Sequence, residues 1–569
     1  MSDTTSITGR YHLRSGRRSV LRFFLLGLVF LFMAIILHWY QPNMGGSGLS
    51  LPFNITAWML VCLAMIAVLL WPFRRRRLRL SKAFIWFFCG MLILIALSLT
   101  TRAVWRENAA LTTAGMIGSL TFYLVLLQLR IRLSAVYWLL MAILLAVVLE
   151  CLLSLIQFFH LPAAARWEFS DQLSVRPYGI FQQINVLASF VATGVALLLY
   201  LCFASTVPSS ALSGRFHVGR QVVCFFLFML FGVTLQLCQS QIGYLATLVA
   251  VLCYCCWFFQ QRTKLLWTVG ALAAGILIGK AMQLWMMTPS VTHIQSSHIR
   301  LMFIIDSLRM FSEKPLFGWG IGGFEYSFLH RFGGEETFIA QGVAAHPHNE
   351  ILLWMVEGGI VGLLGIAAII YGGVIIVKQA YRQKKLPFLT MTFPVLLHMM
   401  TEYPIYQSTP HWLILLLLLR CMDMPRCYCN IPGPVMWGGR ALLGAAAAAS
   451  FVLLAAAYPL QEQLTQTERE GRQAQLPLND LSVGETLLSD RYQFDMHIGD
   501  LLRFNQTGDK QWLLHFERWA ERYSEVHPDA NVYATRMGIA RHFGDTVRLA
   551  ELQKQGRWLF PGDPRFADE

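Results

Sequence analysis

The sequence predicts an all-α fold, a polytopic transmembrane helical bundle, and three observations lead to this class. Hydrophobic residues make up 56% of the 569 residues, charged residues only 14%, and the mean hydropathy is +0.51. Apolar runs of about 18 residues or more recur along the chain, each long enough to cross a bilayer as a helix. Basic residues gather beside these runs, as they do at the cytoplasmic ends of membrane spans.

Apolar runs and their basic flanks together predict about thirteen spans. The first run, Val20 to Trp39, is too long for the hydrophobic region of a signal peptide and lacks an evident small-residue cleavage site, so it predicts a signal anchor. The expected spans are 20–39, 54–73, 83–100, 111–129, 134–158, 184–206, 221–238, 242–259, 265–284, 350–376, 387–401, 411–424 and 438–459.

The positions of the basic residues predict the orientation. With the N-terminus inside, every cluster falls on the cytoplasmic side. The clusters are Arg10, Arg14, Arg17, Arg18 and Arg22; Arg74 to Arg77; Arg130 and Arg132; Arg215 and Arg220; Arg262 and Lys264; and Lys378, Arg382, Lys384 and Lys385. This distribution explains the net charge of +14, so nucleic acid is not an expected partner.

Successive spans end on alternate sides of the membrane. Counted from a cytoplasmic N-terminus, this alternation places three segments outside the cytoplasm: the loop around Phe159 to Gly179, the stretch from Met286 to His348, and the tail after Leu460. The chain therefore divides into a transmembrane domain, residues 1–460, which includes a large periplasmic loop at 286–348, and a periplasmic C-terminal domain, residues 461–569.

The C-terminal domain differs from the rest because it is charged and has helical periodicity. The periodic segments Trp512–Tyr523 and Val532–Phe543, with breaks at Pro528 and Pro561, indicate an α-helical domain of tetratricopeptide-like hairpins. None of the 12 cysteines follows Cys429, so no disulfide is expected in this tail.

Three of the 12 cysteines, Cys421, Cys427 and Cys429, form a loose cluster on a predicted cytoplasmic loop. Metal binding stays open there, although reduced thiols are favoured because a fourth tetrahedral ligand is missing.

Several enzyme classes lack their motifs in this sequence. There is no G-x-x-x-x-G-K-[ST] loop for nucleotide phosphates, no G-x-S-x-G elbow and no H-E-x-x-H zinc helix. The periplasm also lacks ATP and nucleotide sugars. Any transfer chemistry there must use a donor that carries its own activation, such as a lipid pyrophosphate.

The strongest local segment is Ala345-His346-Pro347-His348-Asn349-Glu350, directly before an apolar span. Pro347 disfavours helix at His346, and Asn349 is a good cap for the helix that follows. The two histidines then lie at a helix N-terminus, where backbone N–H groups attract anions, and a neutral imidazole is a natural general base. Two alternatives stay open: interfacial histidines that fix the loop, and a His-x-His zinc site without a clear third ligand.

Three further segments carry polar residues at the outer ends of spans. Arg176, Gln183 and Asn185 enter one span, where they are costly unless they face a cavity or each other. Alternatively, Arg176 reaches lipid headgroups and Asn185 caps a helix. Arg300 and Lys314 could bind phosphate, and the glycines after Lys314 permit a tight turn; a solvated amphipathic helix is the competing account of Arg300. The last segment contains His398, Glu402 and Tyr403.

Together these segments resemble the O-antigen ligase and polymerase superfamily, and most closely its bacterial protein O-oligosaccharyltransferases of the PglL type. The resemblance covers roughly residues 150 to 420, and a periplasmic tail is similar to that of the oligosaccharyltransferase branch. The matching residues, in order, are Arg176, Pro177, Gly179, Gln183 and Asn185; Arg300 with the turn Pro315, Leu316, Gly318 and Gly320; His348, Asn349, Gly359 and Gly362; and Glu402, Tyr403 and Pro404.

The sequence departs from the family at one position. Members of the family commonly have Ser-Arg at the outer end of a middle span, where the arginine helps to hold pyrophosphate. Here the matching residues are Ser240 and Gln241. The resemblance therefore leaves Arg176 and Arg300 to bind the donor alone, or implies a different donor affinity or a different choice of donor.

The resemblance implies a metal-independent, inverting glycosyltransferase of the bacterial inner membrane, without a cofactor and with a periplasmic active site. The donor would be a glycan on undecaprenyl pyrophosphate, and the acceptor a Ser or Thr hydroxyl of an exported, pilin-like protein. His348 would be the general base and Arg300 the second catalytic residue. The residues implied in donor or acceptor binding are Arg176, Gln183, Asn185, Lys314, His346, Asn349, Glu402 and Tyr403.

Three rival functions stay open at this point. A ligase that joins O-antigen to lipid A-core uses the same chemistry but usually lacks the tail. A polymerase of the superfamily would use a second lipid-linked glycan as acceptor. A transporter or flippase would carry its polar residues at the bilayer midplane and often show inverted repeats, whereas here the polar residues cluster at one side.

Overall fold

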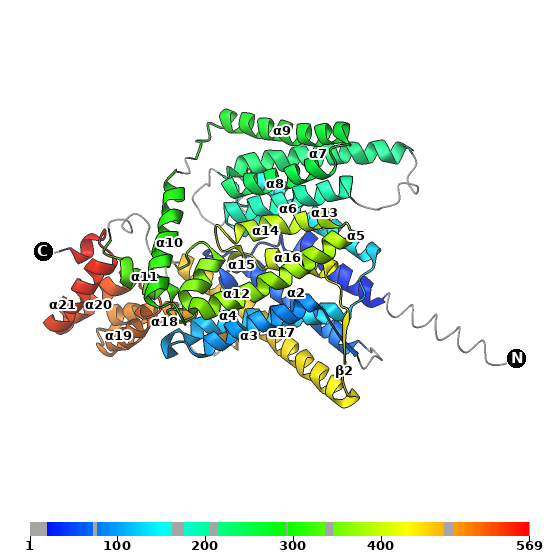
Figure 1. Ribbon diagram of the computed structural model, residues 1–569. Helices are drawn as coiled ribbons and strands as arrows, with labels where there is room; N and C mark the ends of the chain where they lie inside the picture. Colours follow the sequence, from blue (N-terminus) through cyan, green and yellow to red (C-terminus); the bar gives the residue numbers. More distant parts are fainter. Residues whose placement is uncertain are drawn as a thin grey trace.

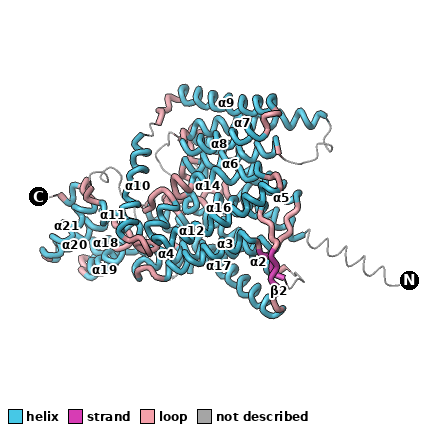
Figure 2. Tube along the Cα trace, viewed as in Figure 1, coloured by secondary structure: helices cyan, strands magenta, loops and turns pink. Residues whose placement is uncertain are grey.

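The computed structural model of the chain describes residues 20–71, 77–161, 176–204, 214–291, 294–335, 345–470 and 483–567. Within these ranges the chain is mostly helical, and its long helices lie side by side (Figures 1 and 2). The predicted basic residues Arg10, Arg14, Arg17, Arg18 and Arg74 to Arg76, and parts of the three predicted outer segments, lie outside the described residues.

The helices of the transmembrane part begin with Val20–Ile36. They continue with α2 (Pro52–Leu70), α3 (Lys82–Leu99), α4 (Arg106–Gln128), α5 (Leu133–Phe158), α6 (Ile184–Phe203), α7 (Gly214–Cys238), α8 (Gln241–Trp257), α9 (Arg262–Trp285), α10 (Ile294–Glu313), α11 (Phe324–Phe332), α12 (Glu350–Arg382), α13 (Leu386–Leu389), α14 (Phe393–His398), α15 (Pro404–Gln407), α16 (Thr409–Met422) and α17 (Gly433–Arg469).

A helix lies at the position of each of the thirteen predicted spans, and the number of helices that cross the membrane stays a prediction. Nine helices in the described part of the chain are long and apolar enough to cross a membrane, and four shorter apolar helices occupy the remaining predicted spans. Two of the short ones, Leu386–His398 and Thr409–Met422, flank residues 399–408, which carry Glu402. Residues 399–408 lie at the end of the bundle where α6 begins, because Glu402 accepts a hydrogen bond from Gln183, the cap of that helix.

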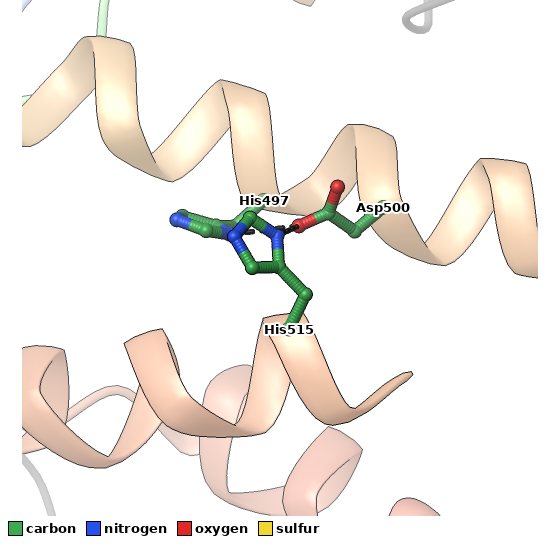
Figure 3. Close-up of side chains that lie close together, drawn as sticks. All are labelled: His497, Asp500 and His515. Carbon is green, nitrogen blue, oxygen red and sulfur yellow. Dashed lines mark hydrogen bonds and ion pairs between the residues drawn. The ribbon is translucent and has the colours of Figure 1, made fainter. Parts of the chain in front are cut away.

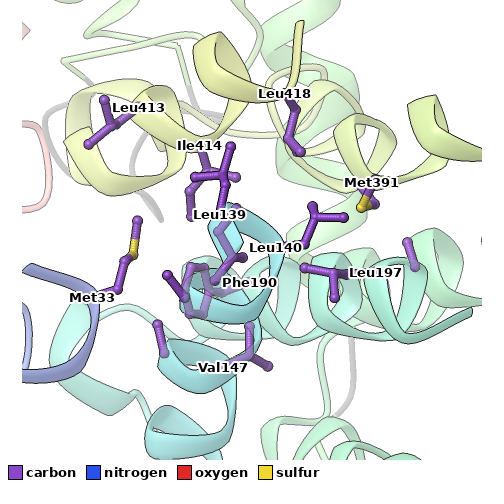
Figure 4. Close-up of a cluster of buried hydrophobic side chains, with 14 of the residues drawn as sticks. Met33, Leu139, Leu140, Val147, Phe190, Leu197, Met391, Leu413, Ile414 and Leu418 are labelled. Atoms are coloured by element: carbon purple, nitrogen blue, oxygen red, sulfur yellow. The ribbon is translucent and has the colours of Figure 1, made fainter. Parts of the chain in front are cut away.

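Helix α6 lies at the centre of the bundle. Helices α5, α7, α8 and α14 all pack against it, and most of its side chains are buried. Figure 4 shows part of this core, where Phe190 and Leu197 of α6 lie among Leu139, Leu140 and Val147 of α5 and Leu413, Ile414 and Leu418 of α16. The first residues of α6 are therefore held at the middle of one end of the bundle.

Basic residues gather at the opposite end of α6. Arg220 donates a 2.6 Å hydrogen bond to the carbonyl of Leu201, and Lys264 donates one to the carbonyl of Cys202. The same charges were predicted from the sequence to mark the cytoplasmic side. The polar residues that begin α6 thus lie at the end of the bundle away from this positive charge.

One element was not predicted: a short antiparallel ribbon of β1 (Arg77–Leu80) and β2 (Cys427–Asn430). It departs from an all-α fold by these eight residues and appears in magenta in Figure 2. Four-residue strands that pair across 350 residues of sequence leave no local periodicity to read.

The glycine turn that follows Lys314 packs against an interruption of helix α12. At Gly359 the backbone has φ 60° and ψ −149°, which interrupts the helix. The exposed backbone groups pair with the turn: Trp319 N–H donates to the Val356 carbonyl (2.9 Å), and Ile360 N–H to the Pro315 carbonyl (2.7 Å). The turn thereby fixes α10 against α12.

Replacing Gly359 with alanine is expected to destabilise the protein. A Cβ atom there would lie 2.5 Å from the Leu316 carbonyl carbon, and the positive φ adds strain of about 1–3 kcal/mol. The matched control is Gly373→Ala in the same helix, where a Cβ meets nothing within 4 Å. Thermal unfolding in detergent should begin at a lower temperature for Gly359→Ala only; equal unfolding temperatures for the two variants would contradict this account.

After α17, the described part of the tail contains four α-helices: α18 (Ser489–Thr507), α19 (Gln511–Ser524), α20 (Ala530–Phe543) and α21 (Thr546–Leu559). Helices α19 and α20 cover the two segments in which periodicity was predicted. The predicted domain boundary at residue 460 falls inside α17, which continues to Arg469.

The tail packs on α11, a helix of the 286–348 loop. Phe328 and Phe332 of α11 share one buried apolar cluster with Tyr533, Met537 and Leu559 of the tail. Polar contacts add to it: Trp105 Nε1 donates to the Glu525 carbonyl (2.8 Å), and His527 Nδ1 lies 2.9 Å from Glu325 Oε2. Burial favours the neutral imidazole, but Asp490 and Glu325 raise the pKa of His527 to about 10, so this contact is an ion pair at neutral pH.

Candidate functional site

A carboxylate, Glu402, gathers side chains from three other helices. It lies in the turn between α14 and α15. Its Oε2 accepts a hydrogen bond from Gln183 Nε2 at 2.9 Å, and its Oε1 accepts one from Asn185 Nδ2 at 2.5 Å and one from Arg300 at 3.2 Å. His398 Nε2 lies 3.1 Å from Oε2. We call Glu402, Gln183, Asn185, Arg300 and His398 the Glu402 cluster.

The start of α6 orients the two amides of this cluster. Gln183 caps the helix, because its Oε1 accepts hydrogen bonds from the backbone N–H groups of Asn185 and Val186. The Gln183 amide nitrogen is then left to donate to Glu402. Asn185 is held from the other side by Ser240 of the α8 cap, which donates a 2.6 Å hydrogen bond to Asn185 Oδ1.

Arg300 joins the Glu402 cluster from α10, which crosses the ends of the spanning helices at the left of Figure 1. Its side chain is 31% exposed, whereas that of Glu402 is 7% exposed. The contact with Glu402 uses one of the five N–H donors of the guanidinium, and the remaining donors could bind a phosphate in a bidentate manner.

The charge of Glu402 is stabilised where it lies. Burial raises the pKa of this carboxyl, but the hydrogen bond from His398 and the charge of Arg300 oppose burial, and the pKa lies below its ordinary value. Glu402 is therefore an anion at neutral pH. An anion that is already paired suits the positioning of cations and amides better than it suits proton abstraction.

Behind Glu402 a line of buried polar side chains leads into the bundle. His398 Nδ1 lies 2.9 Å from Ser189 Oγ, which is 3.4 Å from His411 Nε2, and His411 Nδ1 is 2.7 Å from Ser408 Oγ. His398, Ser189 and Ser408 are fully buried. Sequence reasoning did not select Ser189 or His411; the signal that could have found them is a polar residue inside an apolar span, which is costly without a partner.

His348 and His346 lie next to this cluster, before α12. His348 has a positive φ of 55°, and its backbone N–H donates to His346 Nδ1 at 3.0 Å. The predicted cap is present, because Asn349 Oδ1 accepts hydrogen bonds from the N–H groups of Ile351 and Leu352. The Asn349 amide also donates to the Met400 carbonyl, which ties the start of α12 to the turn that carries Glu402.

The two histidine rings pack against the same tyrosine. Tyr403 lies 4.8 Å from the ring of His346 and 5.5 Å from that of His348, measured between centroids. Burial lowers the pKa of His348; His346 and Arg300 lower it further, and Glu402 opposes them. The imidazole is consequently neutral at neutral pH, the form in which it can accept a proton.

Three residues of interest lie outside these contacts. Arg176 is half-buried, 3.4 Å from the Cys238 carbonyl, and burial lowers its pKa. Lys314 is exposed near the far end of α10, with its ammonium 3.9 Å from the Trp319 ring centroid, and the helix separates it from Arg300 by about 20 Å. Gln241, at the position of the family arginine, is exposed and directly follows Ser240.

The structure therefore brings Gln183, Asn185, Arg300 and Glu402 into direct contact and places His346, His348, Asn349 and Tyr403 beside them. Lys314 is not part of this group. Among the described residues, the two loop histidines do not belong to any group of three metal-ligand side chains.

Comparison with family models gives three matches along the chain. Residues 225–367 match the family described as O-antigen ligase, and residues 177–202 match one described as protein glycosylation ligase. Residues 387–569 match the family described as virulence factor membrane-bound polymerase, C-terminal. A search of curated proteins gave no match. The first two matches cover α6 and its preceding turn, α10 and the start of α12, and the third covers Glu402 and the tail.

Proposed function

We propose, from the membership of this chain in the O-antigen ligase superfamily as a PglL-type protein, that it transfers a glycan from undecaprenyl pyrophosphate to Ser or Thr hydroxyls of exported proteins. It is a multi-pass membrane protein and a glycan-transferring ligase by family. The observation that carries the finer proposal is the Glu402 cluster, in which motif residues from distant parts of the chain meet beside a neutral His348.

In the proposed reaction His348 removes the proton of the acceptor hydroxyl, which is a poor nucleophile at neutral pH. The acceptor oxygen attacks C1 of the glycan while the bond from C1 to the pyrophosphate oxygen breaks, which inverts the anomeric centre. Pyrophosphate leaves without protonation because it is a good leaving group. Its growing negative charge is balanced by the guanidinium groups of Arg300 and Arg176, and no metal takes part in this step.

The other residues of the site are proposed to position the reactants. Glu402 holds Arg300, and Gln183 and Asn185 hold Glu402 at the start of α6. His346 and Tyr403 form one wall beside His348, and Asn349 anchors the helix end. Lys314, farther along α10, would contact the donor away from the reacting carbon. Positioning of this kind matters because a displacement of about 1 Å can cost 10²-fold in rate.

We also propose that the protein lies in the inner membrane with this site on the periplasmic face. The support is the basic residues at the opposite end of the bundle, since cytoplasmic ends carry an excess of Lys and Arg.

Topology reporters should place the loop and the tail outside the cytoplasm. A periplasm-dependent phosphatase fused after Glu335 or at the C-terminus is expected to be active, because the proposed orientation puts the loop and the tail on the periplasmic side. The matched control is a fusion after Lys384, between α12 and α13, which should be inactive. Inactive phosphatase at both Glu335 and the C-terminus would contradict the proposed orientation, and with it the proposed periplasmic reaction.

The acceptor is proposed to be a protein because the tail offers a soluble platform. A lipid A-core acceptor already lies in the membrane and needs no such platform, whereas stacked short helices suit an extended peptide. Binding of the acceptor to the tail would make its hydroxyl effectively intramolecular with His348.

One comparison tests the choice of acceptor. Cells with and without this gene are analysed for glycosylated exported proteins and for O-antigen on lipopolysaccharide. Loss of protein glycosylation alone is expected; loss of O-antigen from lipopolysaccharide alone would identify a ligase. The second candidate is a polymerase, which the match of residues 387–569 favours. It would be revealed by lipid-linked glycans that stay at one repeat unit in the deleted strain.

As the pH is lowered, the rate of transfer should decline only below the pH range in which an ordinary histidine titrates. Only the neutral form of His348 accepts a proton, and burial lowers its pKa from the usual 6.5 despite the opposing charge of Glu402. The rate is therefore expected to stay level as pH falls to about 6.5 and to decline only as pH falls through the lowered pKa. Initial rates between pH 5 and 8 test this; a decline that begins near pH 7 or above would count against His348.

A further inference from the structure

The tail carries a cluster of metal-ligand side chains that the transfer site does not use: His497, Asp500 and His515 (Figure 3). His497 and Asp500 lie one turn apart on α18, and His515 faces them from α19. The Nδ1 atoms of His497 and His515 each lie 2.7 Å from Oδ2 of Asp500. Among the described residues this is the one group of three or more such side chains whose ligand atoms all lie within 4.8 Å of one another.

We propose that these three side chains bind a divalent transition-metal ion, with zinc the expected occupant, and that the ion clamps α18 to α19. Two imidazole nitrogens and one carboxylate oxygen are ligands that zinc prefers, and a water molecule would complete a tetrahedron. Zinc bonds of about 2.0–2.1 Å put tetrahedral ligand atoms about 3.3 Å apart. The observed distances of 2.7 Å from Asp500 Oδ2 to the two Nδ1 atoms need to widen by only about 0.6 Å, which small side-chain rotations can provide.

The surroundings hold the three ligand atoms in this arrangement. Arg503 lies 3.6 Å from Oδ1 of Asp500, the other carboxylate oxygen, and so leaves Oδ2 turned toward the histidines. The ring of His497 stacks on Trp519, with centroids 4.8 Å apart and an interplanar angle of 18°. Such outer contacts fix the orientation of ligands in metal sites and tune their affinity.

Access and burial also fit a bound ion. The side chain of Asp500 is 3% exposed, so its charge is shielded from water, while that of His515 is 53% exposed and opens the cluster to solvent. Without an ion, each Nδ1–H donates a hydrogen bond to Asp500. With an ion, the imidazole proton resides on Nε2 and the two hydrogen bonds are replaced by two coordination bonds.

Zinc binding to the full-length, tag-free protein in detergent tests the proposal. The protein is stripped with a chelator, desalted and titrated with zinc against a chromophoric competitor, and bound zinc is counted by mass spectrometry. One tightly bound zinc per chain is expected. His515→Ala should weaken binding at least 100-fold, and Asp500→Asn should do the same. His542→Ala, which removes another exposed tail histidine, is the matched control and should leave binding unchanged.

Two results would overturn the site: no stoichiometric zinc in the wild type, or unchanged affinity in His515→Ala. Loss of zinc in His346→Ala, with His515→Ala unaffected, would assign the ion to the loop histidines instead. The clamp itself is tested by amide hydrogen exchange, in which zinc should slow exchange across α18 and α19 in the wild type and not in His515→Ala. Equal exchange with and without zinc would refute the clamp. None of these measurements depends on glycan transfer.

Discussion

Replacing His348 with alanine is expected to lower the rate of glycan transfer by about 10²–10⁴-fold, the usual contribution of a positioned general base. Alanine cannot accept the proton of the acceptor hydroxyl. The amount of protein in the membrane should stay near that of the wild type, because the backbone contacts of this segment are made by Asn349 and the N–H group of residue 348. Transfer to a co-expressed acceptor protein is measured together with membrane protein level.

Two further variants distinguish the loss of the general base from the loss of other histidines in the same loop. His298→Ala removes an exposed histidine of the same loop and should transfer at the wild-type rate. His346→Ala removes a ring that packs on Tyr403 and should reduce transfer less than His348→Ala does. Wild-type turnover by His348→Ala would eliminate this residue as the base.

Replacing Glu402 with alanine is expected to have the second large effect, on both stability and transfer. Alanine leaves Gln183, Asn185 and His398 without their acceptor. An unmade hydrogen bond costs about 1–3 kcal/mol at a buried donor such as His398, and less at the half-buried amides of Gln183 and Asn185. Arg300 adds less than a fully buried partner would, because water reaches its side chain. A transfer rate at least ~100-fold lower and a lower unfolding temperature are both predicted.

The control for charge removal is Glu313→Gln on the same helix as Arg300. Glu313 is an exposed carboxylate paired with Arg331 at 2.8 Å, so its loss should change neither measurement. Unfolding temperature and transfer rate are recorded for both variants in the same detergent. If Glu402→Ala unfolds and transfers like the wild type, the Glu402 cluster is not the organising feature of the site.

The sequence could predict the parts of the fold that depend on a local pattern of apolar and polar residues. Apolar runs and basic flanks gave the thirteen helical segments, and periodicity in the tail gave α19 and α20. The grouping of Gln183, Asn185, Arg300 and Glu402 was implied by family resemblance, because residues more than 100 positions apart meet only in the folded chain. Nothing local to Glu402 reveals its partners.

The features that sequence reasoning missed depend on contacts between distant segments. Gly359 lies in an apolar run that predicts an unbroken span, and only the glycine turn after Lys314 explains the break. Lys314 itself was grouped with Arg300 by charge, although about four turns of α10 separate them. Ser189 and His411 are single polar residues inside apolar runs, and their mutual contact requires α6 and α16 to be neighbours.

The contact between α11 and the tail also bears on how the protein is made. Phe332, at the end of α11, is synthesised about 200 residues before Tyr533, with which it shares a buried cluster. At ~5–20 residues per second, the apolar face of α11 waits roughly 10–40 s for its partner. During that interval the apolar face of α11 lacks the cover that the tail later provides. Truncation within the tail would leave that face uncovered permanently and invite degradation.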